Sequence, residues 1–152
     1  MGPVDSPFPR ILVPTDFSLA SEEAWRVAQS LVRALGSELV LLHVLAEGPL
    51  FSEIPFAGDR VRAAYEAARS WVEKRLGEWA EAARTEGGTV RTTMRTGVPY
   101  REILAGAAEE RAGLVVMGTH GLGGLDRALL GSVADRVVRL APCPVLTVRA
   151  AA

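Results

Sequence analysis

Five short apolar runs alternate with long stretches of helical pattern, and this alternation limits the fold of the 152-residue chain more than any other feature. The connections between successive apolar runs are far too long for β-hairpins, so helical crossovers must join the strands. Alternating strands and helices are typical of a parallel sheet with helices on both faces. We therefore predict an α/β fold with a single open five-stranded parallel sheet.

The expected strands are bounded by turn residues and cover 10–16, 38–45, 89–97, 114–118 and 144–148. Pro14 cannot donate a hydrogen bond to a neighbouring strand, so the first strand should end near it. The run 89–97 is rich in threonine and alternates only in part, which favours an edge position. The first strand holds a continuous apolar run, as a strand covered on both faces does. We place it at the centre and expect the strand order 3-2-1-4-5.

Between these strands apolar residues recur at helical spacing. Helices are expected from residue 18 or 21 to 35, and over 59–86, 99–113 and 132–140, while a loop rich in proline and glycine covers 47–58. The helix 59–86 should present one broad apolar face, formed by Ala64, Ala68, Trp71, Val72, Leu76, Trp79 and Ala83. We expect Trp71 and Trp79 to serve in packing or in an interface. Residues 1–9 should form a flexible segment and residues 10–150 a single domain.

Charge and cysteine content limit the partners and the compartment. A formal net charge of −1 gives no basic excess that would attract nucleic acid or an anionic membrane. Cys143 is the only cysteine, so we expect a cytoplasmic protein in which Cys143 is a small buried hydrophobe. The N-terminus lacks the pattern of a secretory signal, and no apolar run reaches the roughly 20 residues of a membrane-spanning helix. Two distant histidines and one cysteine give no cluster of metal ligands.

A glycine-rich loop follows the fourth strand. It begins with Gly118 and Gly121, and Gly131 directly precedes Ser132, where a helical pattern starts. Glycine allows a close backbone approach, and a helix start presents unpaired N–H groups. In an open α/β sheet the ligand lies beyond the carboxyl ends of the strands, where Asp16 and the Gly118 loop are both expected.

Two common phosphate-binding motifs are excluded. The P-loop requires a lysine after its second glycine, but Lys74 is the only lysine and lies in the helix 59–86. The dinucleotide fingerprint requires glycines after the first strand, and the stretch PTDFSLA that follows it has none.

The remaining spacing, G-x₂-G-x₉-G-S, resembles the nucleotide-binding motif of the universal stress protein family. The likeness covers nearly the whole chain. ILVPTDFS resembles the family's first strand and acidic turn, TGVPYREIL its third helix start, and PCPVLTV its last strand. The resemblance implies a Rossmann-like fold of the adenine nucleotide alpha hydrolase type, and it implies ATP, with Mg²⁺, as the cofactor.

The resemblance also implies roles for individual residues. Asp16 would accept hydrogen bonds from the ribose hydroxyls, and the backbone of Val44 would meet the adenine. Gly118 and Gly121 would let the backbone pass close to the ribose and phosphates. A helix N-terminus suits a phosphate without lysine, because it offers free donors and partial positive charge. The implied nucleotide-binding residues are Pro14, Asp16, Val44, Met117, Gly118, Gly121, Gly131, Ser132 and Val133, with Pro14 and Met117 as pocket walls and with Gly131 and Ser132 at the phosphate.

Simpler explanations remain open for several of these residues. Gly118 and Gly121 could be turn residues only, and Asp16 could serve only as a carboxylate at a helix N-terminus. Ser132 with Asp135 also forms the pattern S-x-x-D, a capping pair that needs no ligand.

The two histidines also have structural explanations. His120 could contact a phosphate or act as a base, although a structural role is the simpler explanation. His43 lies inside an apolar strand, and we expect it to be a hydrogen-bonded core histidine.

We thus expect an ATP-binding regulatory or stress-response module with at most slow ATP hydrolysis. No positioned base emerges beyond Asp16 and His120, and the loop offers no lysine or arginine finger except Arg127. A genuine ATP hydrolase and a ligand-free dimeric adaptor are the alternatives. The apolar edge strand Val145–Val148 needs a cover, and the resemblance implies a homodimer through this strand. An unknown protein partner is also possible.

Overall fold

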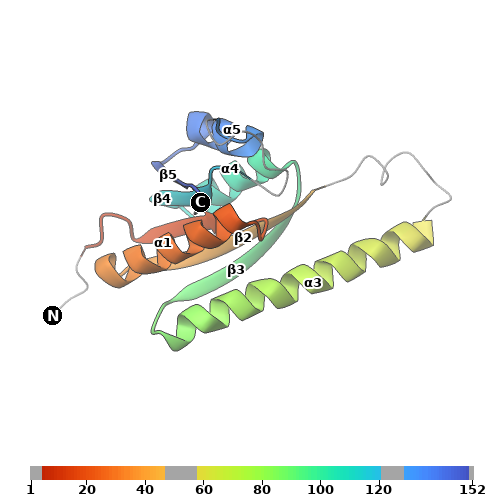
Figure 1. The fold of residues 1–152 in the computed structure, drawn as a ribbon, viewed down its shortest axis with the longest axis horizontal. Helices are drawn as coiled ribbons and strands as arrows, with labels where there is room; N and C mark the ends of the chain where they lie inside the picture. The colour runs from red at the N-terminus through yellow and green to blue at the C-terminus, as the bar shows by residue number, and fades with distance from the viewer. Residues whose placement is uncertain (1–4, 47–57, 121–128, 151–152) are drawn as a thin grey trace.

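The computed structural model describes residues 5–46, 58–120 and 129–150. Within these ranges the strands form one sheet of order β3-β2-β1-β4-β5, and every neighbouring pair is parallel (Figure 1). The predicted class and strand order are therefore confirmed. The strands are β1 (Arg10–Pro14), β2 (Glu38–Ala46), β3 (Val90–Gly97), β4 (Leu114–Gly118) and β5 (Val145–Val148). The helices are α1 (Leu19–Leu35), α3 (Gly58–Thr85), α4 (Pro99–Glu109) and α5 (Ser132–Leu140).

In the described ranges, α1 and α3 cover one face of the sheet and α4 and α5 the other. The alternation of side chains along β2 shows the two layers: Leu41 packs in the cluster with α1 and α3, whereas Val40 and Leu42 pack with α4 and α5. In β1, Leu12 joins the second cluster while its neighbours Ile11 and Val13 join the first. The sequence of β1 is apolar at consecutive positions because both of its faces are buried.

Local backbone chemistry sets the ends of α1. Ser18 is the N-cap, and its side chain accepts a hydrogen bond from the backbone N–H of Ser21 at 3.3 Å. The sequence left these two serines as alternatives, and the structure selects Ser18. Gly36 takes a left-handed φ of 68° and ends the helix, as expected.

The prediction that the third expected helix runs to Gly113 is wrong. α4 ends at Glu109, and Arg111 takes a left-handed φ of 51°. The N–H of Gly113 then donates to the carbonyl of Arg10 at 2.9 Å. This bond to the central strand aligns the chain for β4, so a tertiary contact overrides the helical pattern.

The predicted apolar face of α3 is correct only for the second half of the helix. Its buried residues are Val72, Leu76, Ala80 and Ala83. Ala64 and Ala68 are exposed, and Trp71 is 54% exposed. The reason is geometric, because the first half of α3 reaches past the sheet that covers the second half (Figure 1).

Two further expectations fall at the limits of the described residues. Almost all of the expected loop 47–58 lies outside them, as do residues 1–4 of the expected flexible segment. Phe8 packs against the core, and the division of the chain at residue 9 remains a prediction. No helix in the described ranges combines the length and apolar character needed to span a membrane.

We expect Leu76→Ala to lower the free energy of unfolding by about 2–5 kcal/mol, because it leaves a cavity between α3 and the sheet. Leu140→Ala in α5 is the matched control. Leu76 is 3% exposed and Leu140 is 60% exposed, so the control should change the stability by about 0.5 kcal/mol or less. Urea unfolding measures both values, and equal losses would contradict the packing of α3.

Candidate functional site

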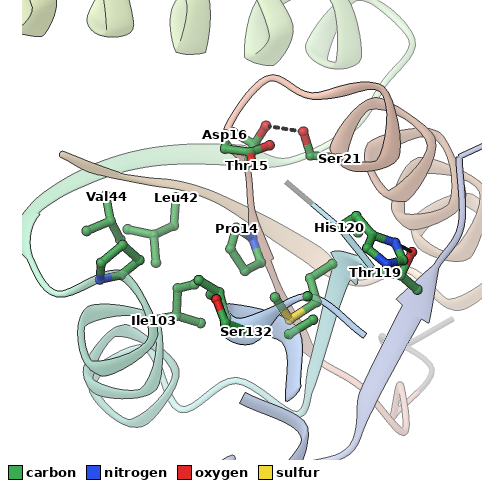
Figure 2. Close-up of a pocket in the computed structure, with 16 residues that line it drawn as sticks. Pro14, Thr15, Asp16, Ser21, Leu42, Val44, Ile103, Thr119, His120 and Ser132 are labelled. Atoms are coloured by element: carbon green, nitrogen blue, oxygen red, sulfur yellow. Dashed lines mark hydrogen bonds between the residues drawn. The ribbon is translucent and has the colours of Figure 1, made fainter. Parts of the chain in front are cut away.

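A pocket of about 330 Å³ lies at the carboxyl ends of β1, β2 and β4, beside the first turns of α4 and α5 (Figure 2). Strands from the middle of the sheet supply its floor, and the two helices supply its sides. The lining residues are Pro14, Thr15, Asp16, Ser21, Leu42, Val44, Pro99, Ile103, Met117, Gly118, Thr119, His120, Gly131, Ser132, Val133 and Ala134.

This pocket brings together every implied nucleotide-binding residue that the structure describes. The eight are Pro14, Asp16, Val44, Met117, Gly118, Gly131, Ser132 and Val133. Gly121 lies outside the described residues. The common location supports one shared site, while the role of each residue toward a ligand stays a prediction.

One part of the pocket has apolar walls. Figure 2 shows Pro14, Leu42, Val44 and Ile103 around a common space, with Met117 from β4 also in the lining. Flat apolar surfaces of this kind suit a planar ring system. The sequence analysis missed Leu42 and Ile103, which look like ordinary core residues. The period of two along β2 was the available signal, because it places Leu42 on the same face as Val44.

The turn between β1 and α1 supplies a carboxylate. Oδ1 of Asp16 accepts a hydrogen bond from the N–H of Ser18 at 3.0 Å. The hydroxyl of Thr15 accepts from the N–H of Phe17 at 3.0 Å and donates to Oγ of Ser21 at 3.1 Å. Asp16 thus contacts the start of α1 and also lines the pocket, so the contact with α1 is observed and the ribose role stays a prediction. The sequence did not predict that Thr15 and Ser21 also line the pocket.

The first turn of α5 supplies hydrogen-bond donors. Gly131 is the N-cap and Ser132 the first helical residue, so the alternative role of Ser132 as a capping residue is not found. The N–H of Gly131 donates to the carbonyl of Thr119 at 2.7 Å, which ties the helix start to the end of β4. The N–H groups of 132–134 have no acceptor within the helix. These donors, together with the positive end of the helix dipole, suit an anion.

Chain packing accounts for two of the glycines. A Cβ on Gly118 would lie 2.8 Å from the backbone carbon and the Cβ of Ala20 in α1. A Cβ on Gly131 would lie 3.1 Å from the carbonyl oxygen of Thr119. Gly118 therefore has no room for a side chain whether or not a ligand is present, and a side chain at Gly131 would make a tight contact. Gly118 is the last residue of a strand pressed against α1, rather than only a turn residue.

The two histidines have different surroundings. His120 lines the pocket, with Nδ1 3.0 Å from Oγ1 of Thr119. Nδ1 of His43 lies 2.7 Å from the carbonyl oxygen of Thr15, so the predicted hydrogen bond of His43 is confirmed. The prediction of a core position is wrong, because His43 is only half-buried. Its partial burial lowers the pKa of the imidazole below 6.5.

Cys143 is also less buried than expected. It packs against the apolar cluster of α4 and α5 but remains partly exposed. Burial raises the pKa of its thiol, which keeps the sulfur in its less reactive form. In the described ranges no group of three or more His, Cys, Asp or Glu side chains could hold a metal ion.

Comparison with known proteins links this chain to one family. The chain matches the model of the Universal stress protein family over residues 7–149. Universal stress protein MJ0531 of Methanocaldococcus jannaschii is 36% identical over 148 residues, which cover 93% of this chain and 82% of that protein. The solved structure of protein MJ0577 from the same organism superposes with a TM-score of 0.78 at 30% identity, covering 94% of this chain and 96% of that chain.

Two more distant structures share the fold and contain nucleotides. An Arabidopsis thaliana member, At3g01520, has AMP bound and superposes with a TM-score of 0.69 at 21% identity, covering 94% of this chain and 92% of that one. Another universal stress protein, in complex with cAMP, gives 0.68 at 24% identity and covers 95% of this chain and 98% of that one.

We expect the stability of the protein to depend on pH through His43. The folded-state pKa is below the unfolded value of about 6.5, so the unfolded chain takes up the proton first as the pH falls. The contribution of neutral His43 is therefore present above pH 6.5 and is lost as the pH falls through the folded-state pKa. His43→Gln keeps a hydrogen-bonding side chain without this titration. Urea unfolding at pH 7.5 and pH 5.5 should show a larger loss of stability in the wild type than in the variant, and equal losses would refute the assignment.

Proposed function

Because the chain belongs to the universal stress protein family, we propose that it binds ATP, with Mg²⁺, in the pocket at the carboxyl edge of its sheet and acts as a regulatory module. One observation carries the proposal: a single pocket combines apolar walls, a carboxylate and the N-terminus of α5. These features match the base, the ribose and the phosphates of a nucleotide. The AMP and cAMP complexes of distant members support the same use of the fold.

The residues present fit each part of the ligand. The apolar walls at Leu42, Val44 and Ile103 would accept the adenine, and Asp16 would accept hydrogen bonds from the ribose hydroxyls. The volume of about 330 Å³ falls in the usual range of small-molecule pockets. Asp16 is the only carboxylate among the described lining residues. Mg²⁺ would therefore be held mainly by the phosphates and water, as is usual for this ion.

The lining favours binding over rapid hydrolysis. None of the described residues that line the pocket is a lysine or an arginine, so no permanently charged cation among them would stabilise the charge of a phosphoryl transfer; Arg127 lies outside the described residues. We propose at most slow hydrolysis of the bound ATP. We also propose a cytoplasmic location, where the single cysteine stays reduced. Sustained turnover of several per second would favour a hydrolase instead. The absence of nucleotide from protein purified without added ligand would favour an adaptor.

We expect Ser132→Pro to weaken ATP binding selectively. Proline is favoured at the first position of a helix, and Gly131 already has the extended backbone, φ −61° and ψ 159°, that precedes proline well. The helix should therefore persist while the hydroxyl and one N–H donor are lost. Bonds to charged groups contribute about 1.5–3 kcal/mol each, so the affinity for ATP should fall about tenfold or more while that for adenosine changes little. Calorimetry with both ligands measures the difference.

A further variant tests the base site, whereas Ser132→Pro tests the phosphate site. Val44→Trp fills the apolar part of the pocket and should abolish binding of ATP and adenosine alike. Val138→Trp is its matched control, because Val138 is 44% exposed on α5 and lies outside the pocket lining. Normal ATP binding by Val44→Trp would place the ligand elsewhere.

We also propose that the protein is a homodimer through β5, an edge strand of the sheet. Among the described strands β5 pairs only with β4, and Leu146 is 38% exposed. The carbonyls of Pro144 and Val148 accept hydrogen bonds from β4, so the backbone groups of the alternate residues, Val145 and Thr147, face the open edge. An apolar edge with free donors and acceptors invites an antiparallel copy across a two-fold axis.

Thr147→Pro should therefore convert the dimer to a monomer, because it removes an outward donor without breaking the bonds to β4. Thr147→Val is the matched control, since it keeps the N–H and nearly the same shape. Light scattering measures the mass of both variants. A Thr147→Pro protein that stays dimeric would place the interface on another surface.

A further inference from the structure

The residue that follows Asp16 has an unusual backbone conformation. Phe17 has a φ of 63°, in the left-handed region that bulky residues rarely adopt. Such a conformation costs free energy and persists only where the surrounding structure holds it. Because Phe17 adjoins Asp16, this dihedral determines how the chain turns from the pocket into α1.

Aromatic rings surround the side chain of Phe17. His43 stacks on it with ring centroids 5.2 Å apart and an interplanar angle of 22°. Trp71 and Trp79 of α3 meet it edge to face at 5.4 Å and 5.3 Å. The guanidinium carbon of Arg75 lies 5.5 Å from the same ring centroid. We call His43, Trp71 and Trp79 the aromatic clamp.

Hydrogen bonds fix the backbone on both sides of Asp16. Before it, the carbonyl of Thr15 lies 2.7 Å from Nδ1 of His43. After it, the N–H of Phe17 donates to the hydroxyl of Thr15, and the N–H of Ser18 donates to the Asp16 carboxylate itself. The aromatic clamp and these bonds together hold the turn on both sides of Asp16.

The aromatic clamp lies on the opposite side of the sheet from the apolar walls of the pocket. Phe17, Trp79 and Trp25 belong to the layer of α1 and α3, whereas Val44 and Met117 belong to the layer of α4 and α5. The ring of Phe17 does not line the pocket, although Asp16 next to it does. Phe17 can therefore influence a ligand only through the turn residues that line the pocket, and Asp16 is the charged one among them.

We propose that Phe17 is a positioning residue: held by the aromatic clamp, it fixes the Asp16 carboxylate where it can accept hydrogen bonds from the hydroxyls of a ribose. This inference rests on the proposed nucleotide site and names the group that gives the site its selectivity for ribose. A carboxylate that is fixed before binding loses less conformational freedom when the ligand arrives. The selectivity therefore depends on residues of β2 and α3 that do not themselves line the pocket.

The test compares ATP with 2′,3′-dideoxy-ATP, which lacks both ribose hydroxyls. The wild type should prefer ATP about tenfold or more, the expected effect of a hydrogen bond to a charged group. Phe17→Gly deletes the ring and allows the left-handed φ without strain, so the protein should fold. Its preference for ATP should fall to about threefold or less. Phe17→Tyr retains the ring and should restore the wild-type ratio.

Control variants separate positioning from general stability. Leu19→Gly changes a nearby apolar residue that is 73% exposed and lies outside the aromatic clamp and the pocket, so it should leave the ratio unchanged. Trp71→Ala removes the exposed member of the aromatic clamp without opening the core. It should lower the ratio in the same direction as Phe17→Gly, and it tests the proposal should Phe17→Gly not fold.

The outcomes are distinguishable. A wild type that binds neither nucleotide refutes the proposed function, and this inference with it. A wild type that binds both equally leaves nucleotide binding intact but overturns ribose recognition by Asp16. A full preference for ATP in folded Phe17→Gly or Trp71→Ala overturns the positioning role alone.

Discussion

The pairing of β1 with β4 is the interaction on which the pocket depends. Ile11 lies beside Leu114 and Leu12 beside Val115, although about a hundred residues separate the two strands in the sequence. Their common direction brings Asp16 and the Thr119 segment out at the same edge of the sheet. Gly118 strengthens this arrangement, because its missing side chain lets β4 approach the first turn of α1. The Asp16 carboxylate and the N–H donors of α5 line the same pocket only because these contacts form.

The pocket relies on backbone groups where many phosphate sites use cations. Its donors come from the start of α5, and the carbonyl of Thr119 anchors that start through the N–H of Gly131. Directional N–H groups of this kind can hold an anion without a cationic side chain. The described part of the site thus offers backbone dipoles, rather than side-chain charge, to an anion.

Much of this architecture was predictable, and the errors have physical causes. Apolar periodicity gave the strands and their parallel arrangement, because each strand must bury one or both faces. Periodicity does not report where the sheet ends, so it could not show that Ala64 and Ala68 lie beyond it. The early end of α4 depends on the bond between Gly113 and Arg10, which no local pattern contains. Leu42 and Ile103 were missed because the same apolar residues serve both cores and pocket walls.

The most specific site assignments came from the family resemblance rather than from periodicity. The order of the elements placed Asp16 and Ser132 at one edge, but the glycine spacing indicated which ligand to expect there. The contacts of Phe17 were not predictable from either source. They depend on a left-handed backbone angle and on where α3 crosses the β1–α1 turn.

The tryptophans around Phe17 have a spectroscopic consequence. Trp71 and Trp79 meet the Phe17 ring, Trp79 also stacks on Trp25 at 6.1 Å, and these three are the tryptophans of the chain. Indole emission is sensitive to its immediate surroundings, so the intrinsic fluorescence of the protein originates beside the turn that carries Asp16. The chain thus contains its own optical reporter, next to the pocket but outside it, and needs no attached dye.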